Sequence, residues 1–191
     1  MIGGLNGLYN SFFGVIEQLL GDWFLGLSAR LVFAGVLFFY YFNSALTKVG
    51  EGVAGFFVVQ DGAYFQIVPP IVEAFDYDAT QVPFIPYGLI VYLGTYSEFV
   101  LPVLVVVGLF TRVAAAGMIG FIVVQSYVDM AYHGVDTETI VTWFDRVSDA
   151  AIFDQRAFWV FLLLYLVLKG PGIISLDGLL GRRRDSVEDV A

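Results

Sequence analysis

Long runs of apolar residues alternate with shorter polar segments along the chain, and four runs approach the ~20 residues that a membrane-spanning helix needs. They cover residues 25–47, 87–110, 113–132 and 155–168. At ~1.5 Å per residue the last run gives only about 20 Å of helix, so we expect this helix to begin earlier, near Ala150. The pattern predicts an all-α integral membrane protein built as a four-helix bundle.

A different pattern precedes the first run, because between residues 2 and 24 apolar side chains recur at helical spacing. The apolar positions are Leu5, Leu8, Tyr9, Phe12, Phe13, Ile16, Leu19 and Leu20, and Asn6, Asn10, Glu17 and Gln18 lie off this stripe. An amphipathic helix in the membrane interface fits the arrangement, and so does a helix packed against the bundle. The expected organisation is an amphipathic helix at 1–24, a transmembrane domain at 25–180 and a charged tail at 181–191.

The connections between the four runs differ greatly in length. The short turn Gly108–Arg112 forces the second and third helices into an antiparallel hairpin. Residues 49–86 and 133–154 form two long connections, and long loops without secondary structure are uncommon unless they are functional. The first contains apolar pieces at 55–59 and 65–72, which indicate short interfacial or re-entrant segments.

The distribution of Lys and Arg indicates how the helices cross the membrane. One side of the predicted bundle collects Arg30, Arg112, Lys169, Arg182, Arg183 and Arg184, and the other collects Lys48, Arg146 and Arg156. This asymmetry favours both termini in the cytoplasm, with the three consecutive arginines as an inner-leaflet anchor. The two long loops then face outward. They are acidic, which fits either ordinary solvated loops or attraction of cations.

Composition narrows the possible chemistry. Hydrophobic residues make up 59% of the chain and charged residues 14%, with a net charge of −9. Cysteine is absent and histidine occurs once, at His133, so thiol chemistry and a bis-histidine haem within one chain are excluded and a metal site is not expected. The sequence contains no phosphate-binding loop, dinucleotide fingerprint or serine elbow. Nothing in it indicates nucleic-acid binding, and the expected surroundings are the lipid bilayer.

Glu98 is the most informative residue, because it lies near the middle of the second run. An ionisable group at that depth costs ~2.5–3.5 kcal/mol on insertion scales, and so marks a site by default. Thr95 and Pro102 share its helical face, which should point into the bundle. The alternative is that this carboxyl has only a structural role, in which it hydrogen-bonds across helices or pairs with an arginine. We weigh the functional and the structural interpretation equally.

Further polar residues gather in the outer halves of the predicted helices. Gln125, Asp129 and His133 follow one another at intervals of four in the third helix, and Asn43 and Lys48 lie near the outer end of the first. Together with Glu98 and Thr95 they predict a polar cavity in the outer half of the bundle, with Glu98 at its bottom and Lys48 and His133 at its mouth. The alternative is a set of interface residues that anchor helix ends.

The chain resembles the DoxX family of small bacterial and archaeal membrane proteins at several motifs in the same order. They are Arg30 through Lys48 in the first helix, Glu98 followed by Gly108-Leu109-Phe110-Thr111-Arg112-Val113-Ala114-Ala115, His133, and a closing run with Gly170, Pro171, Gly172, Ser175 and Asp177. The resemblance covers about residues 25–180 and implies a four-helix membrane fold in the plasma membrane of a prokaryote. It also implies a link to redox biology, since one branch of the family is a subunit of a thiosulfate:quinone oxidoreductase.

Three functions fit these patterns. The first is a membrane subunit of a quinone-linked redox system, in which Glu98 and Asp129 carry protons and Asn43, Lys48, Thr95, Gln125 and His133 line the ligand site. In that case the chain itself holds no covalent cofactor, the cavity holds a quinone, and a soluble or membrane partner supplies the electrons. The second is a non-catalytic scaffold or chaperone that recruits a partner on the outer side. The third is a proton or small-solute carrier, for which the inner halves of the second and third helices are too apolar.

Overall fold

The computed structural model describes residues 2–21, 23–136, 140, 143–144, 146 and 148–181. Within this part of the chain four helices are long and apolar enough to cross a membrane, so the predicted all-α membrane fold is confirmed. The first span comprises α2 (Phe24–Phe33), η1 (Ala34–Phe38) and α3 (Phe39–Leu46); the second comprises η3 (Phe84–Gly88) and α7 (Leu89–Val107); the third is α8 (Thr111–Tyr132); and the fourth comprises η4 (Ala151–Gln155) and α10 (Arg156–Lys169). The fourth helix begins before residue 155, as expected.

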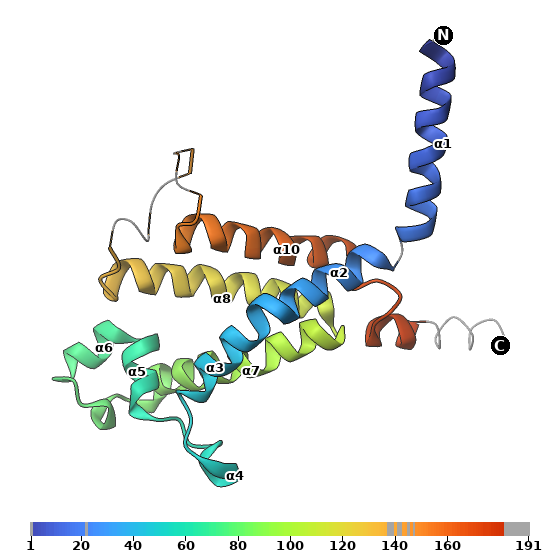
Figure 1. Cartoon of the computed structure of the whole chain (residues 1–191). Coiled ribbons are helices and arrows are strands. Elements are labelled where there is room, and N and C mark those ends of the chain that lie inside the picture. The colour runs from blue at the N-terminus through green and yellow to red at the C-terminus, as the bar shows by residue number, and fades with distance from the viewer. Residues whose placement is uncertain are drawn as a thin grey trace.

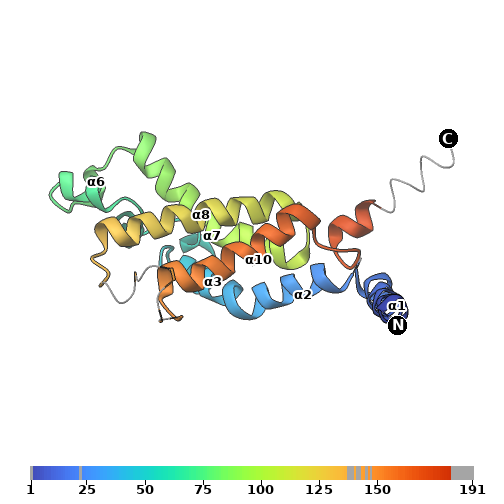
Figure 2. The same ribbon diagram turned by 90° about the horizontal axis from the view of Figure 1, so that it is seen from above.

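The four spans form a closed bundle (Figures 1 and 2). α8 packs against both α7 and α10, and the first span packs against α7 on one side and α10 on the other. Large side chains of the first span, including Phe33, Leu37 and Tyr41, are fully buried against Met118 and Ile122 of α8. Because lipid is as apolar as these side chains, close packing rather than burial from water holds the spans together.

The end of the bundle at which the first span begins and the fourth span ends, called the inner end after the predicted orientation, is held together by the residues of the family motifs. α7 ends at Gly108, which has a left-handed backbone (φ 74°). Asp177 then accepts hydrogen bonds from the backbone N–H groups of Phe110 (2.8 Å) and Thr111 (2.9 Å), and caps the N-terminus of α8 from a distant part of the chain. Arg30 is buried and donates to the backbone carbonyl oxygens of Val106 and Ile174. Arg30 therefore turns inward, and its partners are carbonyl groups.

The remaining motif residues surround this junction. A side chain at Gly26 would come within 2.5 Å of the Pro171 backbone, so the closing run lies directly against α2. Gly170 and Gly172 have positive φ, and the Ser175 hydroxyl donates to the carbonyl oxygen of Gly172 (2.6 Å). Arg112 is exposed, in contrast to Arg30. The short helix 176–181 ends the described part of the chain, so the arginines at 182–184 and most of the predicted tail lie outside it.

The long connection 49–86 is a folded cap at the opposite end of the bundle, called the outer end after the predicted orientation (Figure 1). It contains α4 (Gly52–Gly55), α5 (Asp61–Ile67), α6 (Pro69–Ala74) and η2 (Ala79–Gln81). Ala63 of α5 and Val72 of α6 are fully buried in a cluster with Val91 of α7, which explains why α5 rests on the second span. These segments are short helices, and the expectation that they are interfacial or re-entrant stays a prediction.

The N-terminal helix α1 (Ile2–Leu20) extends away from the bundle at a steep angle to the spans (Figure 1). Its side chains of Leu8, Tyr9 and Phe12 are exposed. Helix α1 lies at the same end of the bundle as helix 176–181, opposite to α5 and α6 (Figures 1 and 2). This geometry leaves the apolar stripe free to meet lipid, and the location of α1 in the interface stays a prediction.

Candidate functional site

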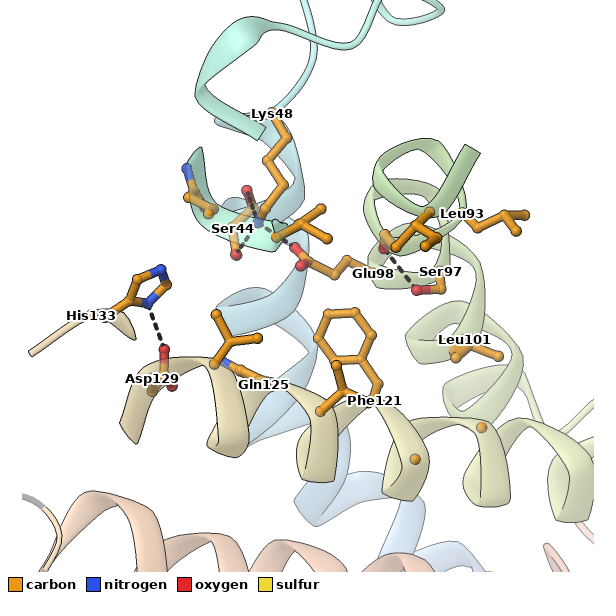
Figure 3. A pocket seen from close by; sticks show the side chains of 18 residues that line it. Ser44, Lys48, Leu93, Ser97, Glu98, Leu101, Phe121, Gln125, Asp129 and His133 are labelled. Carbon is orange, nitrogen blue, oxygen red and sulfur yellow. Dashed lines mark hydrogen bonds and ion pairs between the residues drawn. The ribbon is translucent and has the colours of Figure 1, made fainter. Parts of the chain in front are cut away.

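A cavity of about 470 Å³ lies between α7 and α8 (Figure 3), and residues at the outer end of α3 and in α5 also line it. Its polar lining residues are Ser44, Lys48, Gln66, Ser97, Glu98, Gln125, Asp129 and His133. Apolar residues such as Leu93, Leu101 and Phe121 make up most of the remaining wall. The structure thereby brings together Lys48, Glu98, Gln125, Asp129 and His133, five of the seven residues predicted to form the site.

A buried ion pair forms one side of the cavity (Figure 3). The Nζ atom of Lys48 lies 2.8 Å from Oε2 of Glu98, and the two side chains are only 3% and 5% exposed. Lys48 also donates to the hydroxyl oxygen (2.8 Å) and the backbone carbonyl oxygen (3.2 Å) of Ser44. The prediction that Lys48 stands at the mouth of the cavity is wrong, because the chain turns directly after α3 and folds its side chain back toward α7.

The pairing explains how a carboxyl can be kept at this depth. A charge taken out of water is expensive unless an opposite charge and further hydrogen bonds compensate it. Lys48 immediately follows the C-terminal end of α3, where the helix dipole favours a cation. Glu98 therefore pairs with a residue of another helix and at the same time lines the cavity. A separate feature of this turn of α7 is Pro102, which lacks an N–H group and so leaves the backbone carbonyl of Glu98 without a donor four residues ahead.

A second ionic cluster lies toward the outer end of α8. Asp129 contacts Nδ1 of His133 at 2.9 Å and Nη2 of Arg156 at 2.6 Å. Nη1 of Arg156 donates to the hydroxyl of Ser126 (2.8 Å), so the first turn of α10 is fastened to α8. Arg156 was not among the predicted site residues. Its signal in the sequence was a lone cation in the first turn of the last span, level with Asp129 of the preceding one.

Gln125 lies between the two ionic groups and is held by two tyrosines. Its Oε1 accepts a hydrogen bond from the Tyr41 hydroxyl (3.3 Å), and its amide donates to the Tyr40 hydroxyl (3.0 Å). The predicted stripe of Gln125, Asp129 and His133 therefore does face one cavity. We call these three residues the polar strip, because they line one face of the otherwise apolar α8 at intervals of four.

Two predicted site residues are placed elsewhere. Asn43 is exposed and does not line the cavity, since α3 turns that face outward. Thr95 is fully buried on the same face of α7 as Glu98, but it points into the protein core. Its hydroxyl oxygen has no hydrogen-bond partner among the described residues.

The glycines near the cavity have different roles. A side chain at Gly117 would come within 3.2 Å of Leu101, so this glycine allows α7 and α8 to approach closely. Gly94 does the same for Ile67 of α5, also at 3.2 Å. Gly120 and Gly35 do not bring helices close together, because a side chain at either position would meet open space. At Gly120 that open space is the cavity itself.

The described residues contain no group of three His, Asp or Glu side chains that could hold a metal ion. A family model described as DoxX matches residues 25–130, more than half of the chain. The match includes Lys48, Glu98 and Asp129, whereas His133, Arg156 and the closing run lie beyond it. Neither the curated proteins nor the solved structures provide a match to this chain.

Proposed function

Because the chain belongs to the DoxX family, we propose that it is a membrane subunit of a quinone-linked redox system whose cavity holds the quinone head group. The observation that carries this proposal is the buried Lys48–Glu98 pair in the wall of a largely apolar cavity at membrane depth. Ionisable groups inside a membrane bundle are expensive and are therefore a functional-site hypothesis by default.

The cavity suits a quinone in both of its parts. The head group offers two carbonyl oxygens, which need hydrogen-bond donors, and the Gln125 amide and the His133 ring can supply them. Leu93, Leu101 and Phe121 provide apolar contacts for the ring and for the start of an isoprenoid tail. Ligand sites of this kind are commonly apolar with a few convergent polar groups.

Glu98 and Asp129 both line the cavity, which supports a role for these two carboxylates in proton transfer. Reduction of a quinone to a quinol takes up two electrons and two protons, and its reoxidation releases them. In the proposal Glu98 and Asp129 exchange protons with the head group, and His133, beside Asp129, connects the cavity to the outer side. The electrons come from a redox-active partner protein.

Binding of a quinone to the purified protein tests the proposal. With menaquinone as the probe, Glu98→Gln and Asp129→Asn should each weaken binding about tenfold, equivalent to roughly 1.4 kcal/mol. Glu51→Gln makes the same chemical change in an exposed loop and should leave binding unchanged. Circular dichroism of each variant verifies that the bundle is intact. Equal affinity in all four proteins would sink the proposal.

A second candidate function is a non-catalytic scaffold that recruits a partner on the outer side. It is favoured by apolar side chains on the cap that take no part in the cavity, notably Val53, Phe57 and Tyr77, all exposed. A partner captured equally well by the wild type and by the Glu98→Gln and Asp129→Asn variants would support this function. Loss of the partner after Phe57→Ser and Tyr77→Ser would locate its contact surface.

A further inference from the structure

We infer that the ligand enters the cavity laterally from the bilayer and that the cavity accepts only an uncharged head group. Phospholipids, whose head groups carry a charged phosphate, are therefore excluded. This inference rests on the proposed function, because it specifies the class of ligand for the same cavity. It is carried by two observations, the direction in which the cavity opens and the saturation of its charged groups.

The first observation is that the cavity opens at the depth of the membrane spans. Leu93 of α7 and Val124 of α8 line it, and both side chains are largely exposed, by 64% and 61%. Both lie well inside the two spans. Gly120, one turn deeper on α8 than Val124, adds no side chain to the gap. A molecule dissolved among acyl chains can therefore reach the polar strip without crossing water.

On the outer side, helix α5 covers part of the cavity. Gln66 and Ile67 of α5 line the cavity at its outer end, and the Ile67 side chain packs against α7 at Gly94. The cluster of α5, α6 and α7 around Val72 and Val91 holds this cover in place. Helix α5 therefore narrows the approach from the outer side, where the exposed His133 also lines the cavity.

The second observation is that each charged side chain facing the cavity is already neutralised. The ammonium group of Lys48 has three N–H donors, and Glu98, the Ser44 hydroxyl and the Ser44 carbonyl supply three acceptors. Asp129 is balanced by Arg156, which lies behind it and does not line the cavity. A phosphate group would find no spare cation here, and burying an uncompensated charge is expensive.

Selection by charge matters at this place because phospholipids surround the opening at high concentration. An apolar gap alone would fill with their acyl chains. Polar groups that are mutually satisfied instead favour a neutral head group with modest hydrogen-bonding needs, such as a quinone. Freeing one cation should therefore convert the cavity into a site for anionic lipid.

Native mass spectrometry of lipid retention tests this inference. The protein is loaded in micelles with equal amounts of menaquinone and phosphatidylglycerol, and the retained molecules are counted. The wild type should retain menaquinone. Glu98→Gln, which leaves Lys48 without its counter-charge, should shift the ratio toward phosphatidylglycerol at least about tenfold. Gln125→Lys adds a cation while the ion pair stays intact, so it should show the same shift, and Glu51→Gln should show none.

The outcomes separate this inference from the proposed function. Equal retention of phosphatidylglycerol and menaquinone by the wild type, or an unchanged ratio in both Glu98→Gln and Gln125→Lys, would overturn the selection by charge. A wild type that rejects menaquinone but retains an uncharged diacylglycerol would refute the quinone function and uphold the selection.

The lateral route has its own test, which uses the absence of cysteine from the chain. A nitroxide attached to Val124→Cys in nanodiscs should collide with oxygen, which concentrates in lipid, and hardly with a water-soluble nickel chelate. Leu168→Cys, on an exposed position of α10, serves as the lipid-facing reference. Frequent collision with the nickel chelate at Val124→Cys but not at Leu168→Cys would show entry from water and overturn the route.

Discussion

At the scale of single residues, the ion pair of Lys48 and Glu98 governs the site. Removing one member of a buried pair costs about 3–5 kcal/mol, because the other charge is left uncompensated. Lys48→Met alone should therefore lower the free energy of unfolding by this amount. The double variant Lys48→Met/Glu98→Leu should recover most of it. Unfolding in mixed micelles measures the free energy of unfolding of the single and the double variant. A double variant that is less stable than Lys48→Met would show that the two side chains do not stabilise each other.

Asp78 lies in the outer cap, away from the cavity, so its titration tests the local structure of the cap and not the site. Its carboxylate accepts hydrogen bonds from the Thr80 hydroxyl (2.6 Å), the Gln81 amide (2.7 Å) and the Thr80 backbone N–H (3.0 Å), which lower the pKa of Asp78. A carboxyl with a lowered pKa contributes stability above its unfolded pKa and loses it as the pH falls through the folded pKa. Thr80→Val should raise the pKa of Asp78 in an NMR titration. An unchanged pKa would show that the hydroxyl does not hold the carboxylate.

Residue-scale prediction succeeded where the membrane itself supplies the constraint. Glu98 was expected to face protein because hydrocarbon penalises an idle carboxyl, and it does. Its partner was missed because Lys48 lies beyond the end of the helix, and the direction of its side chain depends on the turn after α3. Arg156 was missed as a partner of Asp129 because helical periodicity gives the faces of a helix but not its rotation against a neighbour.

At the scale of elements, the spans were predictable and the outer cap was not. The thickness of the bilayer fixes the length of each apolar run, so all four helices fall within a few residues of their expected bounds. The helices α5 and α6 are short, and their formation depends on burying Ala63 and Val72 against α7. No local pattern in residues 49–86 specifies that contact.

The cap of α8 provides a prediction at this scale. Asp177 binds the first N–H groups of α8 and also the Thr111 hydroxyl (2.8 Å). Asp177→Ala should therefore destabilise the inner end of the bundle by about 0.5–2 kcal/mol. Hydrogen exchange at the amides of Phe110 and Thr111 should accelerate. Leu180→Ala, an exposed position in the same short helix, is the control, and equal exchange rates in the two variants would contradict the capping role.

At the scale of the whole molecule, four spans place the start of the first and the end of the last on the same side of the membrane. The distribution of Lys and Arg predicts that this side is the cytoplasm. Gly62→Cys in the outer cap and Gly181→Cys after the last span both introduce a side chain into open space. A membrane-impermeant maleimide applied to intact cells should label the first variant only. Labelling of only the second would reverse the orientation.

The central claim is that the cavity between α7 and α8 is where a quinone binds, and photo-crosslinking tests it most directly. An azidoquinone activated in nanodiscs should form adducts mainly at Leu93, Leu101 and Val124, which line the cavity, and excess menaquinone should suppress them. The first span and α10 border a second, almost wholly apolar groove with Phe158 and Leu162, which serves as an internal comparison. Adducts concentrated in that groove, or spread evenly over the lipid-facing surface, would contradict the account.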